Sequence, residues 1–372
     1  MTIAVNTRLR GDEQPEGYED FMFECLNRLT KKYIQHQFLF IFDKPYAESL
    51  AFSKNVTPVI AGPDTKNNLR LQYWFNYKVP AVLRRYKADV FISMDGICSM
   101  RTKKPQCLLI PDLRFISHPW LLKKPRAGFY QKFMPSFLLR AKSIITVSAF
   151  SRSVIADQYK IDADKINVLS HGIDEVYKPH GIDEKEIIKE KYSKGRAYFL
   201  FSGNINPGSN IINLLKAFSF FKKRQKSNML LLIAGKPDEP FITDLKTYKF
   251  RNEVIILDNL SKEEKAKITA AAYAMVHPVL YNDMAVSALQ AMQCNIPVVC
   301  SNTGALPSIC GKAALYCNPQ EFQDIAENMM LLFKDEDKLK ELVKAGKDVV
   351  RQYHWEQTAE VLMQSILRAY NN

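Results

Sequence analysis

The hydrophobic pattern alternates between two kinds of segment along the 372 residues. Short apolar runs rich in Val, Ile and Phe are typical of buried strands. Longer segments with apolar residues three or four positions apart are typical of amphipathic helices. In the first half the pattern predicts strands at 2–6, 37–43, 56–62, 89–94, 106–112 and 143–148, and helices at 18–33 and 71–87.

A second series of strands is predicted at 198–203, 229–235, 253–258, 272–278, 296–302 and 314–318. Near-continuous apolar strands alternating with helices indicate parallel sheets covered on both faces. We therefore predict an α/β fold of two doubly wound, Rossmann-like domains facing across a cleft, with ligands at the carboxyl ends of the strands. The predicted boundaries are 1–173, a polar linker at 174–196, 197–353, and a terminal helix at 354–372 that returns to the first domain.

The composition indicates the compartment of the protein and which kinds of disulfide and metal site to expect. The chain begins with a predicted strand instead of a charged and apolar leader, and it contains no apolar run of about 18 residues, so we expect a cytoplasmic protein. The seven cysteines form no CxxC pair and lie in apolar stretches, which indicates buried thiols. The six histidines show no ligand spacing, so neither a metal site nor a cofactor is predicted.

The net charge of +13 is unevenly distributed. Between Arg101 and Lys142 ten basic residues stand against one acid, Asp112, and aromatic residues lie among them. This pattern suits a peripheral contact with anionic lipid at the inner membrane. The alternative is a core-packed helix with a solvated basic face. No nucleic-acid motif is present, so no nucleic-acid partner is expected. The residues expected to face the membrane are Lys123, Lys124, Arg126 and Lys132.

Several stretches, read in order, resemble one family. They include NTRLRGDEQPEGYEDFMFECL, TKKPQCLLIPDLRF, FLFSGNINPGSNIINLLKAF and HPVLYNDMAVSALQAMQCNIPVVCSN. The series is similar to the retaining glycosyltransferases of family 4, which have the GT-B fold. The resemblance implies a nucleotide-sugar donor, a glycan or lipid-linked acceptor, and sugar transfer with retention at the anomeric carbon. Such transfer depends on neutralising the leaving diphosphate and on positioning the two substrates.

The resemblance places donor binding after Gly203 and Asn204. The family's Arg and Lys fall on Gly208 and Ser209 of this sequence. Losing two charge-assisted hydrogen bonds of about 1.5–3 kcal/mol each would weaken diphosphate binding by about 10²–10⁴. Ser209 is expected to cap the helix that starts near Asn210. Lys236 is expected to compensate in part, unless it is an ordinary solvated lysine.

The family's two glutamates, eight residues apart, fall on Asn282 and Gln290, a spacing that returns to nearly the same helical face. The glycines between them correspond to Asp283 and Ala285. Asp283 either puts negative charge where phosphate would lie or replaces the missing glutamate. The resemblance assigns catalysis to Asp112, Asn282 and Asp283, and further donor contacts to Met284, Ala285, Val286 and Gln290.

On the acceptor side, the histidine of the family's His-Asp pair is Pro111, whereas Asp112 remains. His118 is a possible substitute, with an ordinary surface histidine as the alternative. Glu16 and Gly17 fall in the family's acceptor loop, where the glycine also suits a tight turn. Ser148 and Ser151 are either functional or helix caps. His171-Gly172 and His277-Pro278 are expected near the cleft.

The sequence predicts nucleotide-sugar-dependent transfer to a polysaccharide or glycolipid precursor at the cytoplasmic membrane face. The alternative is a catalytically degenerate pseudo-glycosyltransferase that acts as a scaffold, as the partner of an active glycosyltransferase, or as a glycan- or lipid-binding protein. A third explanation of the missing cations is a sugar donor that carries no diphosphate.

Overall fold

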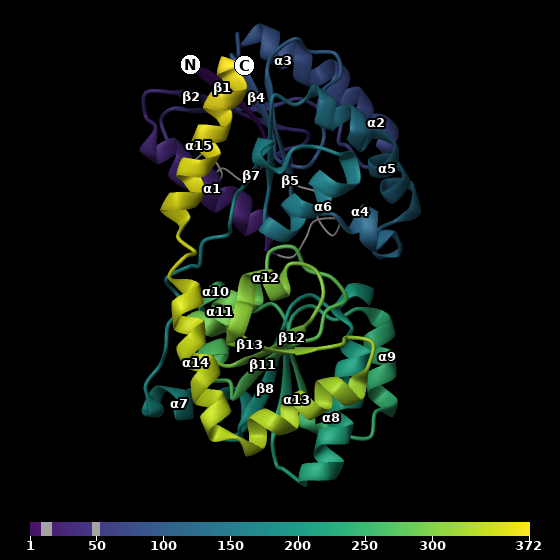
Figure 1. The fold of residues 1–372 in the computed structure, drawn as a ribbon, viewed down its shortest axis with the longest axis vertical. Helices are drawn as coiled ribbons and strands as arrows, with labels where there is room; N and C mark the ends of the chain where they lie inside the picture. The colour runs from purple at the N-terminus through teal and green to yellow at the C-terminus, as the bar shows by residue number, and fades with distance from the viewer. Residues whose placement is uncertain (9–16, 47–52) are drawn as a thin grey trace. The chain divides into compact units, whose positions relative to one another are not determined.

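The chain forms two compact units in the computed structural model, which describes residues 1–8, 17–46 and 53–372. Unit 1 consists of Met1–Gly172 together with His354–Asn372, and unit 2 consists of Ile173–Tyr353. Each unit has one parallel sheet with helices on both faces (Figure 1). The α/β class and the two doubly wound sheets are as the hydrophobic pattern predicts.

The sheet of unit 1 has the strand order β3-β2-β1-β4-β5-β6-β7, and every pairing is parallel. The order reverses between β1 and β4, which makes this the topological switch point, where open α/β sheets bind ligands. The strands are β1 Thr2–Asn6, β2 Gln37–Phe42, β3 Val56–Ile60, β4 Val90–Ser93, β5 Gln106–Ile110, β6 Ser143–Thr146 and β7 Ile166–Val168.

Unit 1 is completed by the last helix of the chain, α15, which runs beside α1 (Figure 1). Arg28 of α1 forms an ion pair with Glu356 of α15 at 2.9 Å, and Lys32 forms one with Glu360. The helices are α1 Tyr18–Lys32, α2 Asn68–Tyr73, α3 Val79–Arg85, α4 Arg114–Ser117, α5 Lys124–Arg140, α6 Ala149–Tyr159 and α15 Trp355–Asn371, with short turns η4 at Pro119–Leu121 and η5 at Ala163–Lys165.

The helix predicted over 71–87 contains a π-helical turn, η3, at Trp74–Lys78 between α2 and α3. Pro80, two residues after this turn, has no N–H to bond the carbonyl four residues earlier, so a regular α-helix cannot continue through it. The wider turn instead lets the Val79 N–H bond the Trp74 carbonyl.

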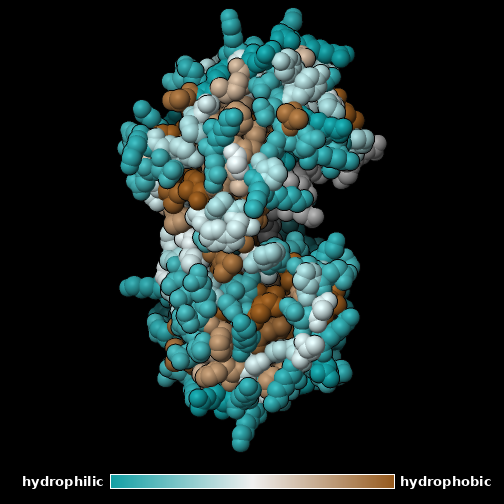
Figure 2. Space-filling model, turned by 90° about the vertical axis from the view of Figure 1, so that its right-hand side faces the viewer, coloured by the Kyte–Doolittle hydropathy of each residue, from teal (hydrophilic) through white to brown (hydrophobic). Residues whose placement is uncertain are grey.

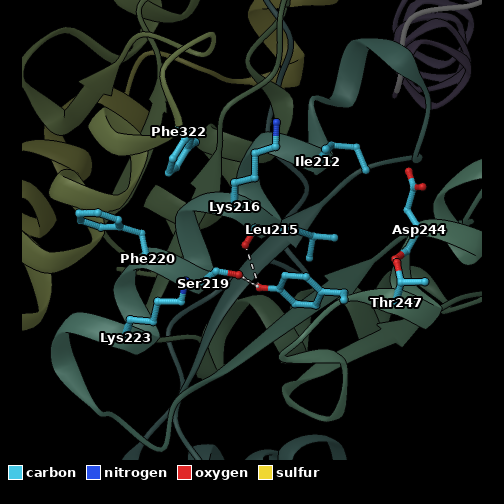
Figure 3. A pocket seen from close by; sticks show the side chains of 10 residues that line it. Ile212, Leu215, Lys216, Ser219, Phe220, Lys223, Asp244, Thr247 and Phe322 are labelled. Atoms are coloured by element: carbon cyan, nitrogen blue, oxygen red, sulfur yellow. Dashed lines mark hydrogen bonds between the residues drawn. The ribbon is translucent and has the colours of Figure 1, made fainter.

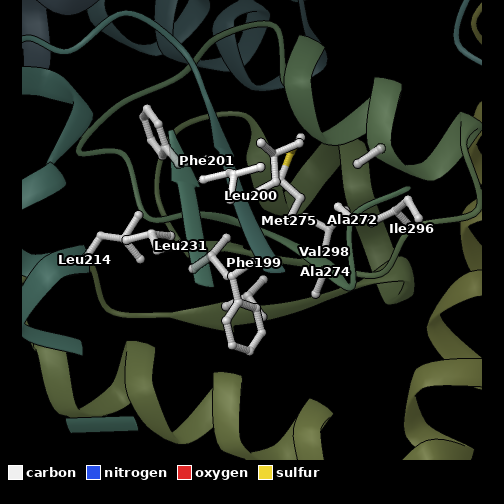
Figure 4. Packing of buried hydrophobic residues seen from close by; sticks show 14 of the residues in the cluster. Phe199, Leu200, Phe201, Leu214, Leu231, Ala272, Ala274, Met275, Ile296 and Val298 are labelled. Atoms are coloured by element: carbon white, nitrogen blue, oxygen red, sulfur yellow. The ribbon is translucent and has the colours of Figure 1, made fainter. Parts of the chain in front are cut away.

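The sheet of unit 2 has the strand order β10-β9-β8-β11-β12-β13, again all parallel, with its switch point between β8 and β11. Its strands are β8 Tyr198–Ser202, β9 Leu230–Ala234, β10 Val254–Leu257, β11 Ala274–His277, β12 Val298–Ser301 and β13 Ala314–Cys317. Phe199, Leu200, Met275 and Val298 are completely buried where adjacent strands pack against the helices (Figure 4). This core holds the carboxyl ends of the six strands at one edge.

Unit 2 includes the segment 174–196 that the sequence suggested as a linker. Its helix α7 packs against α10 inside the unit. The helices are α7 Ile182–Ser193, α8 Ile211–Gln225, α9 Glu239–Thr247, α10 Lys262–Ala271, α11 Val286–Gln293, α12 Leu306–Cys310, α13 Phe322–Lys334 and α14 Glu336–Val350, with short turns η6 at Pro207–Ser209, η7 at Arg251–Glu253 and η8 at Gly311–Ala313.

Two sequence expectations concern burial and membrane crossing. All seven cysteines are buried and carry free thiols, as their apolar surroundings predict. Within the described part of the chain, no helix is both long enough and apolar enough to cross a membrane.

Candidate functional site

The carboxyl edge of unit 2, where the sequence places the donor site, is a set of loops fixed by hydrogen bonds. The Leu280 N–H donates to the Gly208 carbonyl at 2.9 Å. The Asn210 side-chain amide donates to the carbonyls of Pro278 at 2.8 Å and Pro319 at 2.6 Å. The loops that follow β8, β11 and β13 are therefore joined at one place.

Two glycines allow this close packing. A Cβ on Gly235 would lie 1.9 Å from the Gly203 carbonyl oxygen, and one on Gly304 would lie 2.5 Å from the Asn282 carbonyl oxygen. Gly304 also has φ of 62°, in the left-handed region. Sequence reasoning identified Gly203 but missed Gly235 and Gly304. Their positions just after β9 and β12 were the signal, because glycine after a buried strand often marks a close backbone approach.

Asn282 acts as a local cap in this structure. Its side-chain oxygen accepts hydrogen bonds from the N–H groups of Met284 at 2.9 Å and Ala285 at 2.6 Å. Ala285 has φ of 52° and precedes the first residue of α11, so Asn282 lies outside the helix. The expectation that Asn282 and Gln290 share a helical face is therefore wrong, because the left-handed residue breaks the helical repeat between them.

The four residues after Asn282 are mostly buried. Asp283 is only 5% exposed, and its carboxylate accepts a hydrogen bond from the Tyr281 hydroxyl at 2.8 Å. Met284 and Ala285 are buried, and Val286 is half-buried at the start of α11. Gln290 is half-buried one helical turn further on. The carboxylate of Asp283 thus contacts protein, and the backbone N–H groups of Met284 and Ala285 are already paired.

Ser209 does not cap α8, contrary to the sequence expectation. Its hydroxyl donates to the Asn206 carbonyl at 2.7 Å inside the η6 turn. Asn210, in the left-handed conformation, then separates this turn from α8. Gly208 lies in the same turn, and its N–H donates to the Asn206 side chain at 2.8 Å. Asn204 is exposed in the loop before it.

The side chains at this edge carry little positive charge. The six loops 203–210, 235–238, 258–261, 278–285, 302–305 and 318–321 all belong to the described part of the chain. They contain one lysine, Lys236, and no arginine. Their acids are Asp238, Asp258, Asp283 and Glu321. Lys236 is exposed, and its carbonyl accepts from the Ile205 N–H at 3.1 Å, which places it beside the Gly203 loop.

In unit 1, Asp112 lies just after β5 and is paired with Arg114. One carboxylate oxygen accepts from the Arg114 backbone N–H at 2.8 Å, and the other accepts from its Nε at 2.8 Å. Pro111 beside it is buried. The carboxylate that remains from the family's His-Asp pair is thus neutralised by a cation only two residues further along the chain.

The switch point of unit 1 holds a buried charged network that sequence reasoning missed. Arg8 follows β1 and bonds Asp95, which follows β4; its Nη1 also donates to the Thr65 hydroxyl at 3.0 Å. Thr65 in turn donates to the carboxylate of Asp43, which follows β2, at 2.5 Å. Arg8, Asp43 and Asp95 are all nearly inaccessible. The available signal was a charged residue one or two positions after each of three apolar strands.

The remaining acceptor-side residues do not form one cluster. Gly17 has φ of 74° and is the N-cap of α1, which fits its expected turn. Glu16 lies outside the described residues. His118 ends α4; its Nδ1 contacts the Ser117 hydroxyl at 3.0 Å, and partial burial lowers the pKa of its imidazole. Ser148 caps α6 by accepting from the Ser151 N–H at 3.1 Å.

The two other histidines named from the sequence are packed against aromatic rings. His171 stacks on Phe21 and contacts Trp355, with ring centroids 5.6 and 4.6 Å apart. His277 stacks on Phe201 at 5.5 Å, and both of its ring nitrogens are buried without a hydrogen-bond partner among the described residues. Burial lowers the pKa of His277 to about 4, so its imidazole is neutral at physiological pH.

Three of the four residues expected to face a membrane lie on α5, and the fourth, Lys123, immediately precedes this helix. Lys123, Lys124 and Lys132 are exposed, and Trp120 in the preceding turn is 68% exposed. Arg126 is a correction: it is only 4% exposed, because it lies on the side of α5 that packs into unit 1. The same helix buries several aromatic residues, which agrees with the core-packed alternative.

A cavity of about 520 Å³ lies on the outer side of α8, between α9 and the start of α13 (Figure 3). Figure 2, which faces the side of the molecule with α9, shows apolar atoms in a hollow of unit 2 among hydrophilic residues. Lys216, Lys223 and Asp244 line the cavity, and Tyr248 is fixed there by Ser219 at 2.9 Å. None of the residues predicted from the sequence lines it.

Both halves of the chain match family models. Residues 16–176 match the model described as Glycosyltransferase Family 4, and residues 183–349 match that of Glycosyl transferases group 1. The O-antigen chain mannosyltransferase B of Escherichia coli is 29% identical over 250 residues, which are 66% of this chain and 65% of that protein, slightly under two thirds of its length.

Two further similarities cover more of the chain. The O-antigen chain mannosyltransferase RfbU of Salmonella typhimurium is 25% identical over 335 residues, 85% of this chain and 86% of that protein. The solved structure of Anabaena HepE in complex with UDP-glucose has a TM-score of 0.74 at 16% identity, covering 98% of this chain and all of that chain. At that identity the likeness concerns the fold alone.

Proposed function

Because this chain belongs to the group 1 glycosyltransferases of family 4, with their two-domain GT-B fold, we propose that it transfers a sugar from a nucleotide-sugar donor to a polysaccharide or glycolipid precursor. The observation that carries this proposal is the match of both halves of the chain, one to each unit. Two of its relatives are O-antigen chain mannosyltransferases, which suggests a cell-surface polysaccharide or lipopolysaccharide as the product.

In this proposal the donor binds at the carboxyl edge of unit 2. The loop after Gly203, the start of α11 and Lys236 would hold it, since helix N-termini and lysines are the usual partners of phosphate. Gly235 and Gly304 support the proposal, because they allow the backbone of these loops to pack closely. A nucleotide-sugar donor also agrees with the UDP-glucose bound to the HepE structure.

We place the reaction at the cytoplasmic face of a membrane. The support is the exposed group formed by Trp120, Lys123, Lys124 and Lys132 at α5, a combination that suits anionic headgroups. The test is flotation with liposomes that contain anionic lipid. Reversing the charges of Lys123 and Lys124 should abolish flotation, and unchanged flotation would remove the membrane from the proposal.

A second candidate is a catalytically degenerate member that binds a glycan or lipid, or partners an active glycosyltransferase. A specific observation favours it: the six loops of the donor edge contain one lysine against four acids, and Asn282 occupies two N–H groups in the turn just before α11. An edge of this composition attracts a diphosphate poorly, since like charges repel most strongly where water is excluded.

Titration calorimetry with UDP, GDP, ADP and their sugars separates the two candidates. Micromolar binding of one nucleotide sugar, followed by its turnover with an acceptor, would support transfer. Absence of binding to all of them would support the degenerate candidate. In that case the combined change Gly208→Arg, Ser209→Lys, Asn282→Glu and Gln290→Glu should create nucleotide affinity. If it creates none, the donor does not bind at this edge.

A further inference from the structure

A second cavity, of about 580 Å³, lies in unit 1 at the amino-terminal ends of β6 and β7. Ligands of open α/β sheets bind at the opposite edge, where the strands end. The proposed sugar chemistry therefore does not use this cavity. Its volume is within the range of about 300–1,000 Å³ that is usual for pockets that bind small molecules.

The walls of the cavity are apolar. They come from the end of α5, from β6, from the end of α6 and from the segment before η5. Their side chains are Pro135, Leu138, Leu139, Ile144, Tyr159 and Ile161. Leu139 is 89% exposed although it belongs to this apolar group, so a large hydrophobic side chain stands open to solvent beside the cavity. Such a side chain is stabilised when an apolar ligand covers it.

Three cations from separate parts of the chain also line the cavity. Lys142 immediately precedes β6, Lys165 immediately precedes β7, and Arg368 lies on α15. No carboxylate side chain is among the lining residues. The two lysines are exposed and have no ion pair within the described residues, whereas Arg368 donates from Nη1 to the Asn167 side chain at 3.3 Å.

Of the two acids nearest in sequence, Asp162 and Asp164, the first is engaged in the η5 turn. Asp162 accepts a hydrogen bond from the Asp164 N–H at 3.1 Å, and neither residue lines the cavity. Asn372 and Ala141 complete the lining, so the charged side chains of this apolar cavity are all cationic, which complements a molecule with an anionic head and an apolar tail. We propose that this cavity binds one molecule of an anionic lipid, with its tail against the leucines and its phosphate between Lys142, Lys165 and Arg368.

Titration calorimetry tests the proposal by measuring the binding of dodecyl phosphate to the full chain. The dodecyl phosphate is kept below its critical micelle concentration. The expected result is one site per chain. Inorganic phosphate, which lacks the tail, and dodecyl maltoside, which lacks the charge, should each bind at least about tenfold more weakly. Equal binding of inorganic phosphate would reduce the site to a surface anion contact, and equal binding of the maltoside would reduce it to apolar adsorption. Either result overturns the proposal.

Variants locate the site. Lys142→Ala with Lys165→Ala should weaken the binding of dodecyl phosphate at least about tenfold, because two of the three cationic side chains that line the cavity are lost. Leu139→Ser should weaken the binding of dodecyl phosphate while leaving the binding of inorganic phosphate unchanged. The matched control is Lys31→Ala with Lys54→Ala, two exposed lysines of unit 1 that do not line the cavity. Unchanged affinity in the first variant, or an equal loss in the control, would overturn the proposal.

Discussion

Replacing Asn282 by alanine tests whether its side chain fixes the turn that leads into α11. The change removes the oxygen that accepts from the N–H groups of Met284 and Ala285 at 2.9 and 2.6 Å. A hydrogen bond contributes about 0.5–1.5 kcal/mol to stability, so the loss of two amounts to about 1–3 kcal/mol. For a unit of this size, 1 kcal/mol shifts the midpoint by about 2–4 °C, so the variant should melt about 2–12 °C lower.

The control is Asn302→Ala, since Asn302 is an exposed asparagine at the same edge whose side chain makes no hydrogen bond within the described residues. Surface changes of this kind stay within about 0.5 kcal/mol. Thermal unfolding followed by circular dichroism compares both variants with the parent chain. A midpoint for Asn282→Ala equal to that of the parent would show that the side chain is not the cap.

The same variant should gain affinity for anions. Without the Asn282 side chain, the N–H groups of Met284 and Ala285, which lie in the turn just before α11, lose their acceptor, and unpaired backbone N–H groups beside a helix start favour phosphate. Inorganic phosphate should therefore raise the melting midpoint of Asn282→Ala more than that of the parent, because a ligand of the folded state stabilises it by mass action. An equal rise in both proteins would refute the link between Asn282 and the weak anion affinity proposed for this edge.

Three further predictions concern buried groups. Gly235→Ala should destabilise unit 2 by about 1–3 kcal/mol in urea denaturation, because its Cβ would overlap the Gly203 carbonyl; a neutral change would show that the loop adapts. Arg8→Met should destabilise unit 1 by about 3–5 kcal/mol, because Asp95 would keep a buried charge without its cation, and a loss below 1 kcal/mol would contradict this. His277 has a pKa of about 4 in the fold, below its unfolded value near 6.5, so its contribution to stability is complete above pH 6.5 and falls as the pH drops toward 4. His277→Phe should flatten the stability profile over that window, and an unchanged slope would assign the pH dependence to other groups.

The strands of both sheets were predictable because each is a short apolar run between polar segments, as at Tyr198–Ser202. Strand β7 was not, because the three residues Ile166–Val168 are too few to show a pattern. The π-helical turn before Pro80 was also missed. Hydrophobic spacing reports which face is buried, whereas the turn depends on which carbonyls the proline leaves unpaired.

The candidate site was predictable in position but not in its contacts. Placing Gly203 and Asn282 after strands required only the apolar pattern and the family resemblance. That Asn282 caps the next two residues depends on the left-handed backbone of Ala285, a conformation unusual for alanine. The pairing of Arg8 with Asp95 joins residues 87 positions apart, and only the strand order, which brings β1 beside β4, makes them neighbours.

The return of α15 to unit 1 has a practical consequence for dividing the chain. Gly172 touches Trp355, because a Cβ on the glycine would lie 2.4 Å from the indole ring. The Ile173 N–H likewise donates to the Tyr353 carbonyl at 3.2 Å, so the ends of unit 2 lie together. Expressing residues 1–172 alone would leave α1 and the sheet without the helix that covers them. The apolar surface exposed in this way would favour aggregation. Joining Gly172 to His354 through a short glycine linker should instead yield one self-sufficient polypeptide, with 173–353 as the other.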